Sequence, residues 1–167
     1  AYAIGQTSRG TRLIYGKDDE GFWRQLLSFP SPGGALIPAV ASRDGKTVYA
    51  LDDRDGSNQA IVRVNRNLSS PELIYQHNST DVMGYHSDAN REIYAVDFGV
   101  GQSELHFLNP DHADAKTLKA LMGVFPDSDV SIVDSAANRP LHVLAQSSHV
   151  LPATYYLFDR KSKQLRY

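Results

Sequence analysis

The sequence contains no cysteine, no excess of positive charge and no long apolar run. Without cysteine the chain cannot be a disulfide scaffold, hold a thiolate metal site or use a cysteine nucleophile. Its 17 Lys and Arg against 19 Asp and Glu give a formal net charge of -2, so it lacks the positive field that binds a nucleic-acid backbone. The longest apolar stretch, residues 35–41, is interrupted by Pro38 and is far shorter than a membrane span. We therefore expect no nucleic-acid partner and no membrane span, while the compartment, cytoplasm or periplasm, stays open.

Motifs for self-sufficient catalysis are also missing. The nucleophile elbow of α/β-hydrolases, G-x-S-x-G, needs two glycines four residues apart, and no two glycines of this chain have that spacing. Gly99 and Gly101 begin a G-x-G-x-x-G pattern, but Glu104 occupies the third glycine position, so we interpret this segment as a loop. We expect no catalytic residue and no cofactor-binding residue in this chain.

Metal-ligand spacing is likewise absent. Residues 52–56 (DDRDG) resemble a calcium loop, but Gly56 comes too early and no Glu follows in place, so we expect a solvated turn, as at residues 17–21. None of the six histidines forms a local zinc motif. We expect His106 and His142 to be half-buried strand residues, and His149 to lie in the loop before Pro152, on a face that could meet a partner domain. No metal-binding residue and no cofactor is therefore predicted.

The composition that is present favours β structure. Nine Tyr suit pleated, half-buried surfaces, and 12 Gly with 8 Pro supply turns.

Three segments repeat one pattern, which consists of an alternating apolar strand, a polar turn and a second strand. They are residues 36–53 (LIPAVASRDGKTVYALDD), 81–98 (DVMGYHSDANREIYAVDF) and 129–147 (DVSIVDSAANRPLHVLAQS). Their second strands align at Val48, Ile93 and Leu141, which are spaced by 45 and 48 residues. A period of this length is typical of a repeat architecture.

The register continues beyond the second strands. Third strands are predicted at residues 61–65, 105–109 and 155–159, and fourth strands are clearest at 71–75 and 164–167. The head of the chain fits as a shortened copy, with second and third strands at residues 12–15 and 22–27. Four antiparallel strands in each period of about 40–50 residues are the signature of β-propeller blades. We therefore predict an all-β fold, a partial β-propeller of about four four-stranded antiparallel blades, at residues 1–33, 34–77, 78–126 and 127–167.

Two local features refine this prediction. The spacing of Leu118, Leu121, Met122 and Phe125 is helical, so a short helix is expected near residues 112–123, with Asp111 or Asp114 as its N-cap. In the last repeat, Tyr155 and Tyr156 are adjacent in a strand and should point to opposite faces of their sheet. We expect both to be packing residues rather than a binding platform.

Two stretches resemble a known family. Residues 42–49 (SRDGKTVY) resemble the S-x-D-G-K turn of propeller repeats in TolB-like proteins and in prolyl oligopeptidase-type peptidases. Residues 135–165, which include PATYYLFDRKSKQL, are similar to the last well-marked propeller repeat of bacterial prolyl oligopeptidase family members. Departures are confined to turns, at residues 136–138 and at Ala153, where the family usually has Gly.

The resemblance implies a seven-bladed propeller that caps an α/β-hydrolase domain and restricts entry to short peptides. The family's serine, aspartate and histidine lie in the hydrolase domain, which is absent here, so this chain alone is expected to be inactive. The implied partners are that hydrolase domain and short peptide substrates. The alternative is a TolB-like or other ligand- or protein-binding β-propeller with no attached peptidase. Because a seven-bladed ring needs roughly 300 residues, we expect the chain to be a fragment of a longer protein or to close against another copy in a homo-oligomer.

Overall fold

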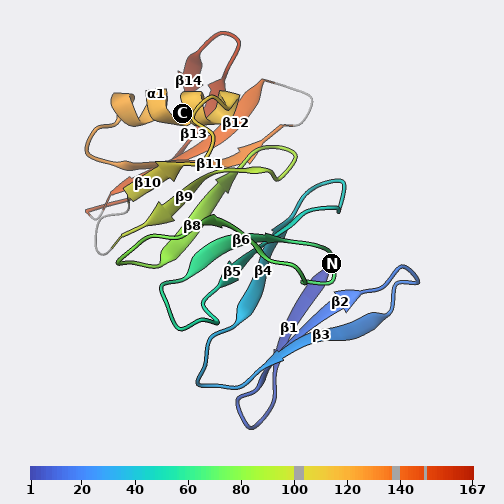
Figure 1. Cartoon of the computed structure of the whole chain (residues 1–167). Coiled ribbons are helices and arrows are strands. Elements are labelled where there is room, and N and C mark those ends of the chain that lie inside the picture. The colour runs from blue at the N-terminus through green and yellow to red at the C-terminus, as the bar shows by residue number, and fades with distance from the viewer. Residues whose placement is uncertain (100–103, 137–139, 149) are drawn as a thin grey trace. The chain divides into compact units, whose positions relative to one another are not determined.

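The computed structural model describes residues 1–99, 104–136, 140–148 and 150–167. Within these ranges the chain is all-β apart from one helix, and its strands form four antiparallel sheets that follow one another along the sequence (Figure 1). The sheets have three, four, three and four strands in chain order. This confirms the predicted all-β fold with one inserted helix and is consistent with a partial β-propeller, although two of the four sheets have three strands instead of the predicted four. The chain divides into two compact units, residues 1–83 and 84–167, which are described separately below.

The first unit begins with a sheet in the order β1-β2-β3, formed by β1 (Tyr2–Gln6), β2 (Arg12–Lys17) and β3 (Trp23–Phe29). The strands β2 and β3 match the predicted pair. The strand β1 was not predicted, because it is short and contains Gly5, a residue that weakens strand propensity. It forms nonetheless, since all five of its residues pair with β2, for example Ile4 with Ile14.

The second sheet of this unit has the order β4-β5-β6-β7. Its strands are β4 (Leu36–Ala41), β5 (Val48–Asp52), β6 (Ala60–Val64) and β7 (Glu72–Tyr75). All four were predicted within a residue or so of these bounds. Pro38 is tolerated in β4 because β4 is an edge strand and the pairing shifts at a bulge between Pro38 and Val40. Ile14 and Leu36 are fully buried in the apolar core of this unit, together with Val48, Ala50 and Val62.

The rest of the chain forms a three-stranded and a four-stranded sheet, in the orders β10-β9-β8 and β11-β12-β13-β14, and β8 begins two residues before the boundary of the second unit. Their strands are β8 (Val82–Ser87), β9 (Ile93–Phe98), β10 (Glu104–Phe107), β11 (Asp129–Ser135), β12 (Leu141–Ser148), β13 (Leu151–Asp159) and β14 (Gln164–Arg166). The helix α1 (Ala113–Val124) lies between β10 and β11 in the chain. In the described residues no fourth strand follows β10, so the helix leads directly into the next sheet.

The helix α1 confirms the predicted segment but begins differently. Its N-cap is His112, neither Asp111 nor Asp114, because the Nδ1 atom of His112 accepts the backbone N–H of Asp114 at 3.1 Å. A ring nitrogen can thus replace the usual carboxylate or hydroxyl at this position. Leu118 and Leu121 are buried in the core of the second unit beside Leu144, and each such burial contributes about 1.5–3 kcal/mol.

The two adjacent tyrosines of β13 point to opposite faces, as predicted. Tyr156 packs against the core beneath the helix, in a tilted ring contact with Phe125 at 5.7 Å between centroids. Tyr155 is 60% exposed on the other face of the same sheet, so only one of the pair is a packing residue in this chain.

Candidate functional site

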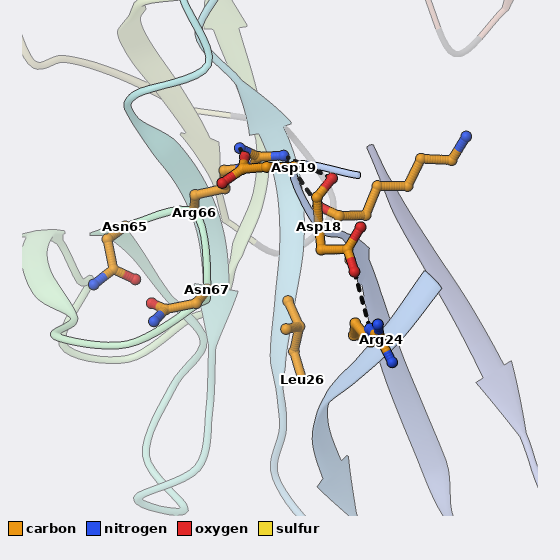
Figure 2. A pocket seen from close by; sticks show the side chains of 9 residues that line it. Asp18, Asp19, Arg24, Leu26, Asn65, Arg66 and Asn67 are labelled. Atoms are coloured by element: carbon orange, nitrogen blue, oxygen red, sulfur yellow. Dashed lines mark hydrogen bonds and ion pairs between the residues drawn. The ribbon is translucent and has the colours of Figure 1, made fainter. Parts of the chain in front are cut away.

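A pocket of about 440 Å³ lies in the first unit, between the β2–β3 turn and the β6–β7 turn. Its volume falls in the range of small-molecule sites. Three basic and two acidic residues line it together with two asparagines, Leu26 and Gly16; the full lining is Gly16, Lys17, Asp18, Asp19, Arg24, Leu26, Asn65, Arg66 and Asn67. In Figure 2, Leu26 lies between Asn67 and Arg24. The pocket therefore combines charged and polar side chains with one apolar side chain, Leu26.

The β2–β3 turn is shaped by Asp18. One carboxylate oxygen of Asp18 accepts the backbone N–H of Phe22 at 2.8 Å, and the other accepts Nε–H of Arg24 at 2.9 Å. The hydrogen bond from Arg24 holds the pKa of Asp18 below its usual value. This turn was interpreted from the sequence as a solvated loop, and its turn residues do lie at the surface, but they also form one wall of the pocket.

The β6–β7 turn is shaped by Asn65 and anchored by Leu68. The side chain of Asn65 accepts the backbone N–H of Ser69 at 2.9 Å and donates to the Ser69 hydroxyl at 2.7 Å. Leu68 has a φ of 62°, an uncommon left-handed conformation for a leucine, yet it is only 2% exposed and belongs to the core. The second wall is thus fixed to the core by a buried side chain.

Arg66 joins the two turns. Its guanidinium donates to the carboxylate of Asp19 and, at 3.1 Å, to the backbone carbonyl of Lys17 (Figure 2). Its own backbone carbonyl accepts the hydroxyl of Tyr2 at 2.6 Å. Burial of this hydroxyl raises the pKa of Tyr2, although the charge of Arg66 acts in the opposite direction. Contacts from side chain and backbone therefore hold the walls together.

The loop after β5, considered above as a calcium loop, uses its carboxylates internally. Asp52 accepts two hydrogen bonds from Arg54, each of 2.7 Å, and this pairing raises the pKa of Arg54. Asp53 accepts the backbone N–H of Ala35 at 2.6 Å, and Asp55 accepts from both the N–H and the hydroxyl of Ser57. Among the described residues, no three His, Asp or Glu side chains are grouped as a metal site.

The second unit holds a buried polar cluster under the helix. His142 is 2% exposed, and its Nδ1 atom lies 2.6 Å from the hydroxyl of Ser135. Its Nε2 atom is 3.4 Å from the carboxylate of Asp114, which accepts a 2.7 Å hydrogen bond from Arg160. Burial raises the pKa of Asp114, but the interaction with His142 and the positive charge of Arg160 outweigh burial, so the pKa lies below its usual value.

Two further histidines of this unit also face aspartates. His86 is 3.1 Å from Asp97, and the Nε2 atom of His112 is 3.5 Å from Asp88. The ring of Tyr94 stacks on His112 with centroids 5.2 Å apart and planes 3° apart. Burial, reinforced by the neighbouring carboxylates, raises the pKa of the Tyr94 hydroxyl.

The order serine–histidine–aspartate in this cluster invites comparison with a hydrolase triad. The geometry does not support nucleophilic catalysis, because His142 is almost completely enclosed and Arg160 already neutralises Asp114. A general base must reach both its nucleophile and a bound substrate. We therefore assign Ser135, His142 and Asp114 a structural role, the attachment of α1 to the last sheet.

Two histidines differ in burial from what the sequence predicts. His142 is more deeply buried than predicted, whereas His106 is exposed on β10, so the half-buried prediction is wrong for both. His106 alternates along β10 with the half-buried Leu105 and Phe107, so its side chain lies on the more exposed face of the sheet. Val100, Gly101 and His149, and the turn at residues 137–139, lie outside the described residues.

Comparison with known proteins agrees with the resemblance noted in the sequence. No family model matches the chain. Dipeptidyl aminopeptidase BIII of Pseudoxanthomonas mexicana is 26% identical over 173 aligned residues, which cover 98% of this chain and 24% of that protein. The chain is thus a distant homologue of a dipeptidyl aminopeptidase and spans about a quarter of its length, consistent with a propeller portion of a prolyl oligopeptidase family peptidase. No helix in the described part of the chain has the length and apolar character needed to cross a membrane.

Proposed function

We propose that the chain is the non-catalytic propeller portion of a prolyl oligopeptidase-like serine peptidase. Its role is to restrict the entry of short peptides to an α/β-hydrolase domain carried elsewhere in the same protein. The observation that supports this most directly is the extent of the similarity, which takes in 98% of this chain but only 24% of dipeptidyl aminopeptidase BIII. The division into four blades at residues 1–33, 34–77, 78–126 and 127–167 is part of this proposal.

The described architecture supports a role without bond cleavage. Four antiparallel sheets and one helix contain no strand-to-helix elbow of the kind that exposes a nucleophilic serine. The serine that contacts a histidine, Ser135, does so in an enclosed cluster. Catalysis would then depend on residues outside this chain.

The first test is to read the gene on both sides of the segment that encodes these residues. The proposal expects a G-x-S-x-G motif within about 200 residues after Tyr167, since a catalytic domain of that fold needs an elbow. A gene with only further sheet repeats would instead favour a binding propeller without a peptidase, the alternative suggested by the turn at residues 42–49.

The second test concerns the gating role. The purified 167-residue chain should not hydrolyse chromogenic dipeptidyl substrates, while the complete protein should. Opening the propeller in the complete protein, by deletion of residues 1–83, should let it cleave longer peptides that the intact protein rejects. Unchanged size selectivity in a deletion variant that still cleaves dipeptidyl substrates would overturn the gating role.

A further inference from the structure

We propose that the pocket between the β2–β3 and β6–β7 turns binds the carboxylate end of a short peptide whose terminal side chain is apolar. Only the choice of a peptide as the molecule that bears the carboxylate rests on the proposed function. The pocket itself is defined by the residues that line it.

Arg24 supplies the principal recognition group. Its Nε atom is engaged by Asp18, which fixes the orientation of the guanidinium. In the part of the chain that the structure describes, its two terminal nitrogens contact no acceptor, and the side chain is 65% exposed. A guanidinium held in this way presents a planar pair of donors, and that arrangement matches a carboxylate.

Asn67 supplies a second donor from the opposite wall. Its side-chain oxygen accepts the hydroxyl of Ser69 at 2.9 Å, which assigns the amide orientation and turns the NH₂ group away from that contact. Within the described residues this NH₂ group has no acceptor. Asn67, Leu26 and Arg24 all line the pocket, so polar groups from the β6–β7 turn and from β3 share it with one apolar side chain.

Leu26 provides the apolar surface. It is half-buried and packs against the core of the first unit. Its Cδ1 atom would lie 2.7 Å from a Cβ atom at position 16, so Gly16 leaves the space that Leu26 occupies beside the pocket. An apolar terminal side chain placed on Leu26 would bury area that a bare anion cannot bury.

The acidic residues of the pocket each have a cationic partner, which offsets their repulsion of an anionic ligand. Asp18 pairs with Arg24, and Asp19 pairs with Arg66. With three basic and two acidic residues in the lining, the positive excess is small. It suits a singly charged carboxylate better than a doubly charged phosphate.

The walls are arranged before any ligand arrives. Each turn is closed by its own side-chain hydrogen bonds, and Arg66 connects the two turns through Asp19 and the carbonyl of Lys17. A site whose groups are already held loses little conformational entropy on binding. The open and exposed position of Arg24 keeps the affinity low, so weak binding in the millimolar range is expected.

The test is an NMR titration of the ¹⁵N-labelled 167-residue chain with N-acetyl-Ala-Leu, which has a free carboxylate, and with its C-terminal amide. The free acid should shift amide signals of residues 16–26 and 65–69 in a saturable manner, and the amide should bind about tenfold more weakly. Acetate and inorganic phosphate serve as further probes. Phosphate binding as tight as that of the peptide would show a general anion site and would overturn the assignment.

Two variants make the test specific. Arg24→Gln removes the donor pair, and Asn67→Asp keeps the oxygen that accepts from Ser69 while it replaces the NH₂ group with a repelling oxygen. Each should weaken binding of the free acid about tenfold or more, while Arg9→Gln, a change at an exposed arginine outside the pocket, should leave it unchanged. Unaltered affinity in both pocket variants, or no saturable shift at millimolar peptide, would overturn the proposal. The hydrolase domain takes no part in this titration. A negative result would therefore overturn the carboxylate site without contradicting the gating role, which the deletion experiment tests separately.

Discussion

Arg160 donates a 2.7 Å hydrogen bond to the carboxylate of Asp114, and this contact joins the end of β13 to the first turn of α1. The two residues are 46 positions apart in the chain. Asp114 is 4% exposed and also lies 3.4 Å from the buried ring of His142. One carboxylate therefore attaches the helix to two strands of the last sheet.

Replacing Asp114 with asparagine should lower the free energy of unfolding by about 2–3 kcal/mol. The substitution keeps the size of the side chain but removes the charge that Arg160 and His142 face. The loss is moderated because Arg160, with a 38% exposed side chain, can turn toward solvent. Urea denaturation followed by circular dichroism measures the change.

Asp111→Asn is the matched control. Asp111 pairs with Lys116 at 2.9 Å, but the two side chains are 91% and 63% exposed. Such a surface pair contributes less than about 1 kcal/mol. If the two substitutions lowered the free energy of unfolding equally, the burial of Asp114 would add nothing to its contribution to stability.

The same carboxylate should give the fold an acid-sensitive component. The folded-state pKa of Asp114 lies below its usual value, so the unfolded chain takes up the proton first as the pH falls. The stabilisation is fully present above the unfolded value of about 3.9 and is lost as the pH falls through the lower folded value. Denaturation midpoints measured between pH 6 and pH 2 should fall less steeply in Asp114→Asn than in the parent chain. Parallel curves would contradict this assignment.

The strands could be predicted because the residue pattern that specifies them is local and recurs in each repeat. Each repeat pairs strands that are close in sequence, and the turn at Ser42 closes itself, with the hydroxyl donating to Asp44 at 2.6 Å. The strand β1 escaped prediction, because its pairing with β2 outweighs the weak propensity of its own five residues.

The pocket could not be predicted, because its walls are two ordinary polar turns that are distant in sequence. Asp19 and Arg66 are separated by 47 positions, and either turn alone resembles any exposed hairpin. The cluster around His142 was missed for the same reason. Its partner Asp114 was considered only as a helix cap, and their contact exists only once α1 has docked on the sheet.

Tyr94→Phe should stabilise the second unit. The hydroxyl of Tyr94 is buried and, among the described residues, has no hydrogen-bond partner, while the ring stacks on His112. Phenylalanine keeps the ring and removes a polar atom whose burial is unfavourable, so the free energy of unfolding should rise by about 1 kcal/mol. Thermal denaturation at neutral pH measures this. A destabilised variant would mean that the hydroxyl has a partner that supports the fold.

Gly34→Ala should destabilise the first unit severely, because the backbone of another loop occupies the space beside Gly34. A Cβ atom at this position would lie 2.7 Å from the Cα atom of Arg54 and closer still to the carbonyl oxygen of Asp53. Neither atom can move without disturbing the 2.6 Å hydrogen bond from Ala35 to the Asp53 side chain. We expect a loss of about 2–3 kcal/mol, the size of other overpacking effects. Gly123→Ala is the matched control, since among the described residues no atom outside the adjacent helix backbone lies within 4 Å of a Cβ there, and alanine favours the helix. Urea denaturation should therefore show a lower midpoint for Gly34→Ala and an equal or higher one for Gly123→Ala, and the reverse order would refute the close approach at Gly34.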